Sequence, residues 1–223
     1  MPENKLGPYA LNSIITGDAR ILAEAIPEKS IDLIFCDPLY DRIDDYRWLA
    51  EIAKRLLKPD GNCLAFTNAK WLPILLQSVP ARLPVLSYQR ASALCPLNGR
   101  IISKTSHLIW WGSGKIVGYM PDGYLSTNWS KNYQDPGGHR WTKNPKYIQL
   151  VIANFTRPGA IVMDFFSGHG TIPAACKMLG RHYLAFEIDP PSAERARERL
   201  IHTQPILDIT LLTSHSQPPL FGA

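Results

Sequence analysis

A carboxylate, a proline and an aromatic side chain directly follow one apolar run of this 223-residue chain. The run is "SIDLIF", and the residues after it, in "CDPLY", include Asp37, Pro38 and Tyr40. Asp is a poor strand residue and Pro ends a hydrogen-bond ladder, so a strand should stop here. A plain strand-to-turn junction would use the same residue types. Because ligands of open α/β sheets bind at the carboxyl ends of strands, these three residues are also candidates for a functional site.

A second stretch with chemical potential is "IVMDFFSGHGTIPAACKMLGRHYLAFEID", residues Ile161 to Asp189. It is typical of a strand, a glycine turn, a helix, a second strand and an acid. Gly168 and Gly170 let the backbone turn tightly and approach a ligand closely. Glu187 ends the second strand, where an acid can accept hydrogen bonds from the ribose hydroxyls of a nucleoside. The pattern therefore indicates a nucleoside cofactor, with a purely structural turn as the alternative.

The residues around the glycine turn favour one nucleoside cofactor over another. A dinucleotide-binding turn has a third small residue where this chain has Pro173, and it begins directly at the strand end. Here Asp164 stands before the turn, and its negative charge would repel a pyrophosphate. The same charge would attract an ammonium and a sulfonium, which are the charges of S-adenosylmethionine. We therefore predict an S-adenosylmethionine site and rank a nicotinamide oxidoreductase last.

These residues require a sheet to position them, and short apolar runs do alternate with helical patterns. The predicted strands are Ser13–Thr16, Ile31–Cys36, Cys63–Thr67, Val85–Gln89, His107–Trp111, Ile161–Phe165 and Tyr183–Glu187. The predicted helices are Ala19–Ala25, Tyr46–Leu57, Lys70–Ser78, Lys146–Phe155, Thr171–Leu179 and Ser192–His202. Such alternation is typical of βαβ units, so we expect an α/β fold with a mostly parallel sheet.

The chain length fits one domain, which we assign to residues 1–214. Within it, residues 112–141 are rich in Gly, Pro, Asn and Ser and show no periodicity. Loops of this length in compact domains are usually functional or disordered. Residues 215–223 are predicted to form a disordered tail.

The charge of the chain is unevenly distributed. The net charge is +5, but residues 61–160 carry eleven Lys or Arg and two acids, which makes this segment +9 and the rest −4. A basic segment suits a polyanion, and aromatic residues within it, such as Trp129 and Tyr133, are what unstacked bases bind to. A solvated basic face without a partner is the alternative.

The cysteines and the first residues bear on the compartment. Cys36, Cys63, Cys95 and Cys176 show no close pair spacing, so no metal site is predicted. Three of them lie in apolar runs, where a free Cys packs as a small hydrophobe, as suits a reducing compartment. The start "MPENKLGPYA" has no apolar signal region. We expect a soluble, intracellular protein of the cytoplasm.

With "DPLY" and "DFFSGHGT" both considered, the chain resembles the amino-group DNA methyltransferases, which methylate adenine N6 or cytosine N4. The catalytic motif of that family is usually written (D/N/S)PP(Y/F/W), and its cofactor motif resembles DxFxGxGT. The order of the motifs is similar to the permuted subgroup, the beta class, in which the catalytic motif comes first. The resemblance covers roughly 12–200. It implies a Rossmann-like methyltransferase fold: a seven-stranded, mostly parallel sheet with helices on both faces.

The resemblance assigns catalysis to Asp37, Pro38 and Tyr40. An exocyclic amine is a poor nucleophile because its lone pair is conjugated with the ring. Asp37 would accept one amine hydrogen, the carbonyl of Pro38 the other, and Tyr40 would stack on the base. Asp37 would also stabilise the positive charge that grows on the nitrogen. A base inside a duplex cannot react, so the DNA must be single-stranded or have the base flipped out.

By the same resemblance, ten residues should bind the cofactor: Asp18, Thr142, Lys143, Asn144, Asp164, Phe166, Gly168, Gly170, Thr171 and Glu187. Asp18 should approach the adenine, Glu187 should hold the ribose, and Asp164 should lie near the ammonium. Phe166 and the glycines should form the wall around the methionine part, and residues 142–145 should contact its carboxylate. Asp18 could instead cap the helix that follows, and Phe166 could belong to the core.

The sequence departs from the family pattern at two places. Leu39 replaces the usual second proline, which costs the loop rigidity but leaves the Pro38 carbonyl available. Asn144 stands where the family often has lysine before the proline, and Lys143 could substitute for it. These departures permit a second class of function, a nucleic-acid-binding subunit that holds the cofactor but has lost catalysis.

The substrate has several candidates. An aspartate at position 37 favours adenine N6, since serine is more frequent in enzymes that methylate cytosine N4. Related motifs also serve RNA and protein amides. The target-recognition region is short, about fifty residues between Gln89 and Trp141, which suggests relaxed or short-site specificity, or help from a second subunit. Related enzymes of the permuted subgroup often dimerise, so a homodimer is among the expectations.

Overall fold

The structure is a computed structural model. It describes residues 4–80, 82–88, 94–97, 100–103, 106–115, 117 and 143–206. Of the predicted loop at 112–141, only residues 112–115 and 117 lie within the described part, and the predicted tail at 215–223 lies outside it. Thr142, one of the predicted cofactor residues, also lies outside the described residues.

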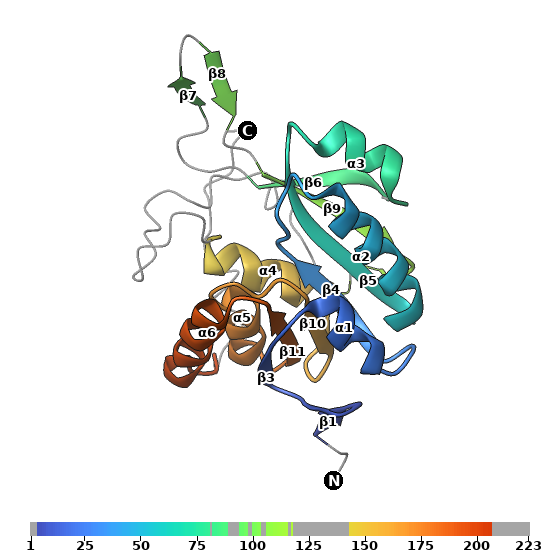
Figure 1. Cartoon of the computed structure of the whole chain (residues 1–223), viewed down its shortest axis with the longest axis vertical. Helices are drawn as coiled ribbons and strands as arrows, with labels where there is room; N and C mark the ends of the chain where they lie inside the picture. Colours follow the sequence, from blue (N-terminus) through green and yellow to red (C-terminus); the bar gives the residue numbers. More distant parts are fainter. Residues whose placement is uncertain are drawn as a thin grey trace, which may run out of the picture.

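A seven-stranded sheet forms the centre of the chain, as predicted (Figure 1). Its strands, in spatial order, are β3 (Ser13–Thr16), β11 (His182–Glu187), β10 (Ile161–Asp164), β4 (Ile31–Cys36), β5 (Leu57–Asn68), β9 (Ser106–Gly112) and β6 (Arg82–Tyr88). The first five are mutually parallel, and β9 pairs antiparallel with both β5 and β6. The prediction of a mostly parallel α/β sheet is therefore confirmed.

Helices cover both faces of this sheet (Figure 1). One face carries α1 (Ala19–Leu22), the 3-10 helix η1 (Ala23–Ala25), α2 (Ile43–Leu56) and α3 (Leu72–Ser78). The other carries α4 (Pro145–Phe155), α5 (Thr171–Met178) and α6 (Pro190–His202). Strand β4 shows the reason: Leu33 and Phe35 pack toward α4 to α6, whereas Ile34 and Cys36 pack toward the other layer. A strand buried on both faces needs a continuous apolar run, which "LIFC" supplies.

Several element boundaries differ from the prediction. Strand β5 begins at Leu57, six residues before the predicted start at Cys63. The register between β4 and β5 shifts between the pairs Ile31–Leu57 and Leu33–Asn62, so the extra residues of β5 are accommodated in a bulge. The structure also contains two short ribbons that were not predicted, β1 (Lys5–Leu6) with β2 (Tyr9–Ala10) and β7 (Leu94–Leu97) with β8 (Arg100–Ser103).

The described cysteine side chains behave as the composition indicated. Cys36, Cys63 and Cys176 are free and buried within the two apolar clusters. Burial raises the pKa of each of these thiols, so they are inert hydrophobes at neutral pH. In the described part of the chain, none of the helices is both long and apolar enough to span a membrane.

Candidate active site

Three neighbouring strands bring carboxylates to one edge of the sheet. Asp37 follows β4, Asp164 ends β10 and Glu187 ends β11, and these strands are adjacent and parallel. Both Glu187 and Asp37 are close enough to Asp164 for their negative charges to influence its ionisation. Residues from the two informative stretches of the sequence are thus brought together at the carboxyl edge, where open α/β sheets bind ligands.

Asp164 is the most deeply buried of these carboxylates, with 2% of its surface exposed. Burial raises the pKa of Asp164 well above its ordinary value, and the negative charges of Glu187 and Asp37 raise it further. A hydrogen bond from the Phe166 amide to Asp164 Oδ1, at 3.1 Å, acts in the opposite direction and lowers the pKa. A buried carboxyl group of this kind is stabilised as an anion when a cation binds beside it. Asp164 is therefore suited to an ammonium partner.

Glu187 holds the glycine turn in place. Its Oε2 accepts a hydrogen bond from the Gly168 amide at 2.6 Å, and its Oε1 accepts one from the Asp189 amide at 2.9 Å. Both carboxylate oxygens of Glu187 therefore have backbone partners, and the side chain is half-buried. A carboxylate fixed in this way is preorganised and retains lone pairs for further donors, such as ribose hydroxyls.

The two glycines of the turn have different surroundings. Both adopt a left-handed conformation, with φ of 50° at Gly168 and 73° at Gly170. A Cβ on Gly168 would meet nothing within 4 Å, whereas one on Gly170 would lie 2.9 Å from the Cβ of Ala196 in α6. Gly168 thus leaves open space beside the turn, and Gly170 permits the close approach of α5 to α6. Between them and β10, the Ser167 hydroxyl is buried and has no hydrogen-bond partner within the described residues.

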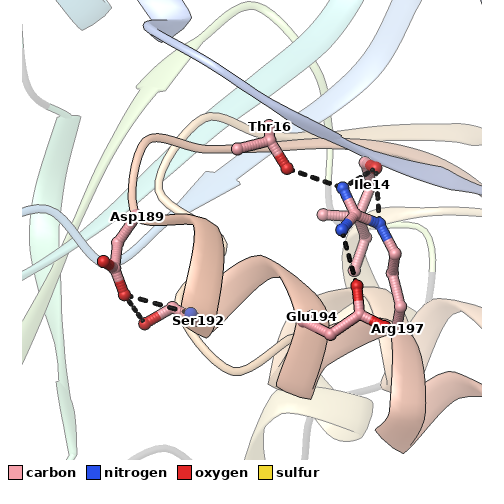
Figure 2. Close-up of polar contacts among 6 residues, drawn as sticks. All are labelled: Ile14, Thr16, Asp189, Ser192, Glu194 and Arg197. Atoms are coloured by element: carbon pink, nitrogen blue, oxygen red, sulfur yellow. Dashed lines mark hydrogen bonds and ion pairs between the residues drawn. The ribbon is translucent and has the colours of Figure 1, made fainter.

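Helix α6 ties the end of β11 to the end of β3 (Figure 2). Asp189 caps the helix by accepting hydrogen bonds from the amide and hydroxyl of Ser192. Further along, the Arg197 guanidinium donates to the Ile14 carbonyl and, at 2.6 Å, to the Thr16 hydroxyl. The loop after β3, which leads to Asp18, is therefore anchored to the same helix as the loop after Glu187.

Asp18 acts as a helix cap in this structure. Its Oδ1 accepts a hydrogen bond from the Arg20 amide at 2.8 Å, at the N-terminus of α1. This is the structural role that the sequence left open, and contact with an adenine stays a prediction. The preceding Gly17 amide donates to the Glu187 carbonyl at 2.9 Å, so Asp18 does lie beside the carboxyl end of β11.

Phe166 and Thr171 lie on the two sides of the glycine turn. Phe166 is half-buried and packs edge-on against Trp48 of α2, with ring centroids 6.3 Å apart. It therefore contributes to the core while leaving part of its surface exposed. The Thr171 hydroxyl accepts a hydrogen bond from Arg199 of α6 at 2.8 Å, and this bond helps to fix the first turn of α5.

Asp37 has an unexpected partner, Lys143. The two side chains form an ion pair with 2.5 Å between the lysine Nζ and Asp37 Oδ2. The lysine ammonium also lies over the rings of Tyr40 and Phe66, at 5.4 Å and 4.7 Å from their centroids. The sequence predicted Lys143 at the cofactor carboxylate, and the structure instead pairs it with Asp37, the carboxylate that was predicted to be catalytic.

The remaining residues of the two loops have mostly structural positions. Asn144 caps α4 by accepting a hydrogen bond from the Lys146 amide at 2.9 Å. Pro38 is buried, and Tyr40 is half-buried against the core beneath α4 to α6. Leu39, which stands in place of the family's second proline, is 63% exposed. The predicted motif thus combines two half-buried side chains, Asp37 and Tyr40, with an exposed apolar one.

Comparison with known proteins supports the class that these motifs indicate. A family model described as DNA methylase matches residues 103–198, a range that includes Lys143, Asp164 and Glu187 but not Asp37. The chain is 26% identical to the type II methyltransferase M.BamHI of Bacillus amyloliquefaciens, over 85% of this chain and 57% of that protein. It is 25% identical to the type II methyltransferase M.HinfI of Haemophilus influenzae, over 94% and 74% of the two chains.

A solved structure agrees with the fold. The crystal structure of the M1.HpyAVI–SAM complex is similar to this chain with a TM-score of 0.66 and 22% identity, and the match covers 84% of this chain and 98% of that one. This chain therefore has the same fold as that protein. Together with the family model and the two relatives, this similarity supports the class of amino-group methyltransferases that the motifs indicate. The chain spans little more than half the length of M.BamHI.

Three features of the site were missed by sequence reasoning. They are the Lys143–Asp37 ion pair, the unpaired Ser167 hydroxyl and the anchoring of the β3 loop by Arg197. The ion pair and the Arg197 contact join residues far apart in the chain, and the burial of the Ser167 hydroxyl is a result of packing. The one available signal was that "SGHG" places a hydroxyl inside the glycine turn, which marks Ser167 as a candidate.

Proposed function

We propose that the protein transfers a methyl group from S-adenosylmethionine to the exocyclic amine of a base in DNA, with adenine N6 the preferred target. The observation that carries the proposal is the convergence of Asp37, Asp164 and Glu187 at one edge of the sheet, around a glycine turn. Two of these carboxylates suit the cofactor, and the third suits an amine.

The residues around the glycine turn fit the cofactor. S-adenosylmethionine supplies an activated methyl group when it is bound. Asp164 would pair with its ammonium, because a buried carboxyl group gains most from a nearby cation. Glu187, already fixed by two amides, would accept hydrogen bonds from the ribose. The open space at Gly168 and the unpaired hydroxyl of Ser167 leave room and one further polar contact beside them.

The residues after β4 would act on the base. Asp37 and the carbonyl of Pro38 would accept the two amine hydrogens, which orients the nitrogen lone pair and fixes the reacting geometry. The Asp37 carboxylate then stabilises the positive charge that grows on the nitrogen, and this electrostatic contribution is usually the largest one in such a site. Tyr40 would stack on the flipped base, which needs a pocket wall outside the duplex.

DNA is the substrate that the relatives favour, since both named relatives are type II methyltransferases. The basic segment at residues 61–160 suits a polyanion. We propose a duplex with a flipped base, with a single strand as the alternative, and a restriction partner as in other type II systems. Asp37 favours adenine over cytosine on the family pattern alone. A second subunit would extend the short target-recognition region.

The test uses tritiated S-adenosylmethionine. The protein is incubated with unmethylated duplex DNA, single-stranded DNA and RNA, beside an Asp37→Ala variant, and the labelled nucleoside is identified after digestion. Label in N6-methyladenine from DNA, absent in the variant, is the expected result. Label in N4-methylcytosine would change the base and keep the mechanism, and label only in RNA would replace the substrate. Cofactor binding without any transfer would overturn the enzymatic proposal in favour of a binding subunit.

A further inference from the structure

The Lys143 ammonium occupies the position at Asp37 that the proposed function gives to the target amine. We propose that Lys143 is a positioning residue that keeps the catalytic carboxylate closed until the methionine carboxylate of the cofactor draws it away. The base would then bind productively only after the cofactor. This inference rests on the proposed function and adds to it an order of binding and a residue that sets this order.

The contacts of Lys143 are those expected for a substitute for the base. The ammonium donates to Asp37 Oδ2 at 2.5 Å and lies over the ring of Tyr40, the two side chains assigned to the amine and the plane of the base. Only 6% of the Lys143 side chain is exposed, while 30% of that of Asp37 remains so. The ring of Phe66 adds a second aromatic face at 4.7 Å, and such faces attract cations. A buried ammonium here therefore excludes the base from the pair of groups it needs.

The chemistry of the reaction requires this ion pair to open. An ammonium has three donors and no acceptor, so it competes directly with the amine hydrogens for Asp37. Its positive charge would also oppose the charge that grows on the amine nitrogen during methyl transfer. The carboxylate of Asp37 can stabilise the positive charge on the nitrogen only if Lys143 has not already neutralised the negative charge of Asp37. A permanent ion pair and an active catalytic carboxylate are therefore incompatible.

The structure also provides a reason for Lys143 to move when the cofactor binds. Its backbone is fixed by the cap of Asn144 and by Pro145 at the start of α4, but its four-carbon stem is flexible. The ammonium and the carboxylate of a methionine group share one carbon atom, so an ammonium at Asp164 places the carboxylate nearby. Asp37 is close enough for its negative charge to influence the ionisation of Asp164. The cofactor carboxylate is thus an alternative anion for the same lysine.

The exchange predicts a thermodynamic competition that needs no DNA to measure. While Asp37 holds Lys143, part of the affinity for the cofactor carboxylate is lost, because only the fraction of molecules with a released lysine binds at full strength. Removal of the Asp37 charge should therefore strengthen binding of the carboxylate. A purely structural ion pair would show no such preference, or would weaken binding by disturbing the loop.

The experiment compares two ligands by calorimetry: S-adenosylhomocysteine and its decarboxylated analogue, which keeps the adenosine, the thioether and the ammonium. The measured quantity is the carboxylate preference, the ratio of the Kd of the analogue to the Kd of S-adenosylhomocysteine. This ratio removes any effect of Asp37 on the shared ammonium. The variants are Asp37→Asn, Lys143→Met and the double variant, with Lys143→Gln as a second replacement and thermal melting to show that each is folded. Lys146→Met, an exposed lysine at the start of α4, is the matched control.

We expect Asp37→Asn to raise the carboxylate preference by about three- to tenfold, as release from competition requires. Lys143→Met and Lys143→Gln should lower the carboxylate preference toward a ratio of one. In the Lys143→Met background, Asp37→Asn should not change this ratio further. Lys146→Met should keep the parental ratio. An unchanged or lower preference in Asp37→Asn would overturn the exchange and leave the proposed function intact. Failure of the parent protein to bind S-adenosylhomocysteine would overturn the cofactor assignment and this inference with it.

Discussion

Glu187 and Asp37 lie at the carboxyl ends of two strands of the same sheet, but their hydrogen-bond partners differ in kind. Glu187 accepts hydrogen bonds from two backbone amides, those of Gly168 and Asp189. Asp37 is held by the end of a flexible side chain, Lys143. A group fixed by backbone amides is preorganised, whereas one held by a lysine can be released by a competing anion. The proposed cofactor half of the site is therefore held by backbone hydrogen bonds, and the proposed base half by an ion pair that can open.

The surroundings of the two loops extend this contrast. Gly170, the N-cap of α5, lies against Ala196 of α6. Helix α6 is in turn anchored to β3 by Arg197 (Figure 2). The loop after Asp37 instead carries Leu39 with 63% of its surface exposed. Loops with few buried contacts are the ones that move on binding. Substitutions around the glycine turn should consequently weaken cofactor binding, whereas substitutions after β4 should lower turnover without weakening it.

The largest effect is expected from the base half. Asp37→Ala should lower methyl transfer by about a hundredfold or more, because it removes both an amine acceptor and the charge that stabilises the transition state. Cofactor binding should remain. The measurement is a single-turnover transfer assay with labelled cofactor, beside calorimetry. Asp44→Ala, which removes an exposed carboxylate paired with Arg47, is the matched control and should stay near the parental rate. Parental activity in Asp37→Ala would remove Asp37 from the mechanism.

Next in size, Glu187→Gln should weaken cofactor binding by about ten- to a hundredfold, since hydrogen bonds to a charged group are worth about 1.5–3 kcal/mol. The amide nitrogen of the new side chain would also oppose one of the two backbone donors. Calorimetry with S-adenosylhomocysteine measures the effect. Glu198→Gln, an exposed change on α6, should leave the Kd unaltered. If both variants bind equally well, the ribose assignment is wrong.

The two glycines should separate stability from binding. Gly170→Ala should lower the free energy of unfolding by about 1–3 kcal/mol, because a positive φ is combined with a close approach to Ala196. Gly168→Ala should cost only about 1 kcal/mol of backbone strain but should weaken cofactor binding, since its methyl group enters the open space. Urea unfolding and calorimetry on both variants test this. Equal effects of the two changes on binding would contradict the assignment of the open space to the cofactor.

The smallest effect concerns pH. Burial raises the pKa of Asp164 in the folded protein above its unfolded value of about 4. The folded state therefore binds more protons, and stability should fall as the pH rises from about 4 toward the raised pKa, by up to about 1.4 kcal/mol per pH unit. Asp164→Asn should remove this contribution. Urea unfolding at several pH values shows it as the difference between the two proteins, and a difference that does not vary with pH would refute the prediction.

The fold could be predicted from the sequence because each layer leaves a local pattern. Alternating apolar runs and helical periods predicted the seven strands and six helices of the sheet layers, with errors at boundaries such as the start of β5. That error has a physical cause. Residues 57–62 belong to the part of β5 where its register with β4 shifts, so their extended conformation depends on the neighbouring strand. The ribbons β1–β2 and β7–β8 are too short to leave a periodic signal.

The candidate reactive residues could be identified before the fold was known. Asp37, Asp164 and Glu187 each follow a buried run, and the carboxyl ends of parallel strands must meet at one edge. The turn residues Gly168 and Gly170 could likewise be identified, since few other residues adopt their conformation.

The pairing of these residues depends instead on how the helices pack against the sheet. Lys143 reaches Asp37 across 106 positions of the chain, and Arg197 reaches Thr16 across 181. No local pattern encodes such contacts, because a long side chain selects its partner from whatever the packed elements bring within reach. The sequence therefore defined the parts of the site, and the packing of α4 and α6 against the sheet decided which of them are held rigidly and which are held by an exchangeable charge.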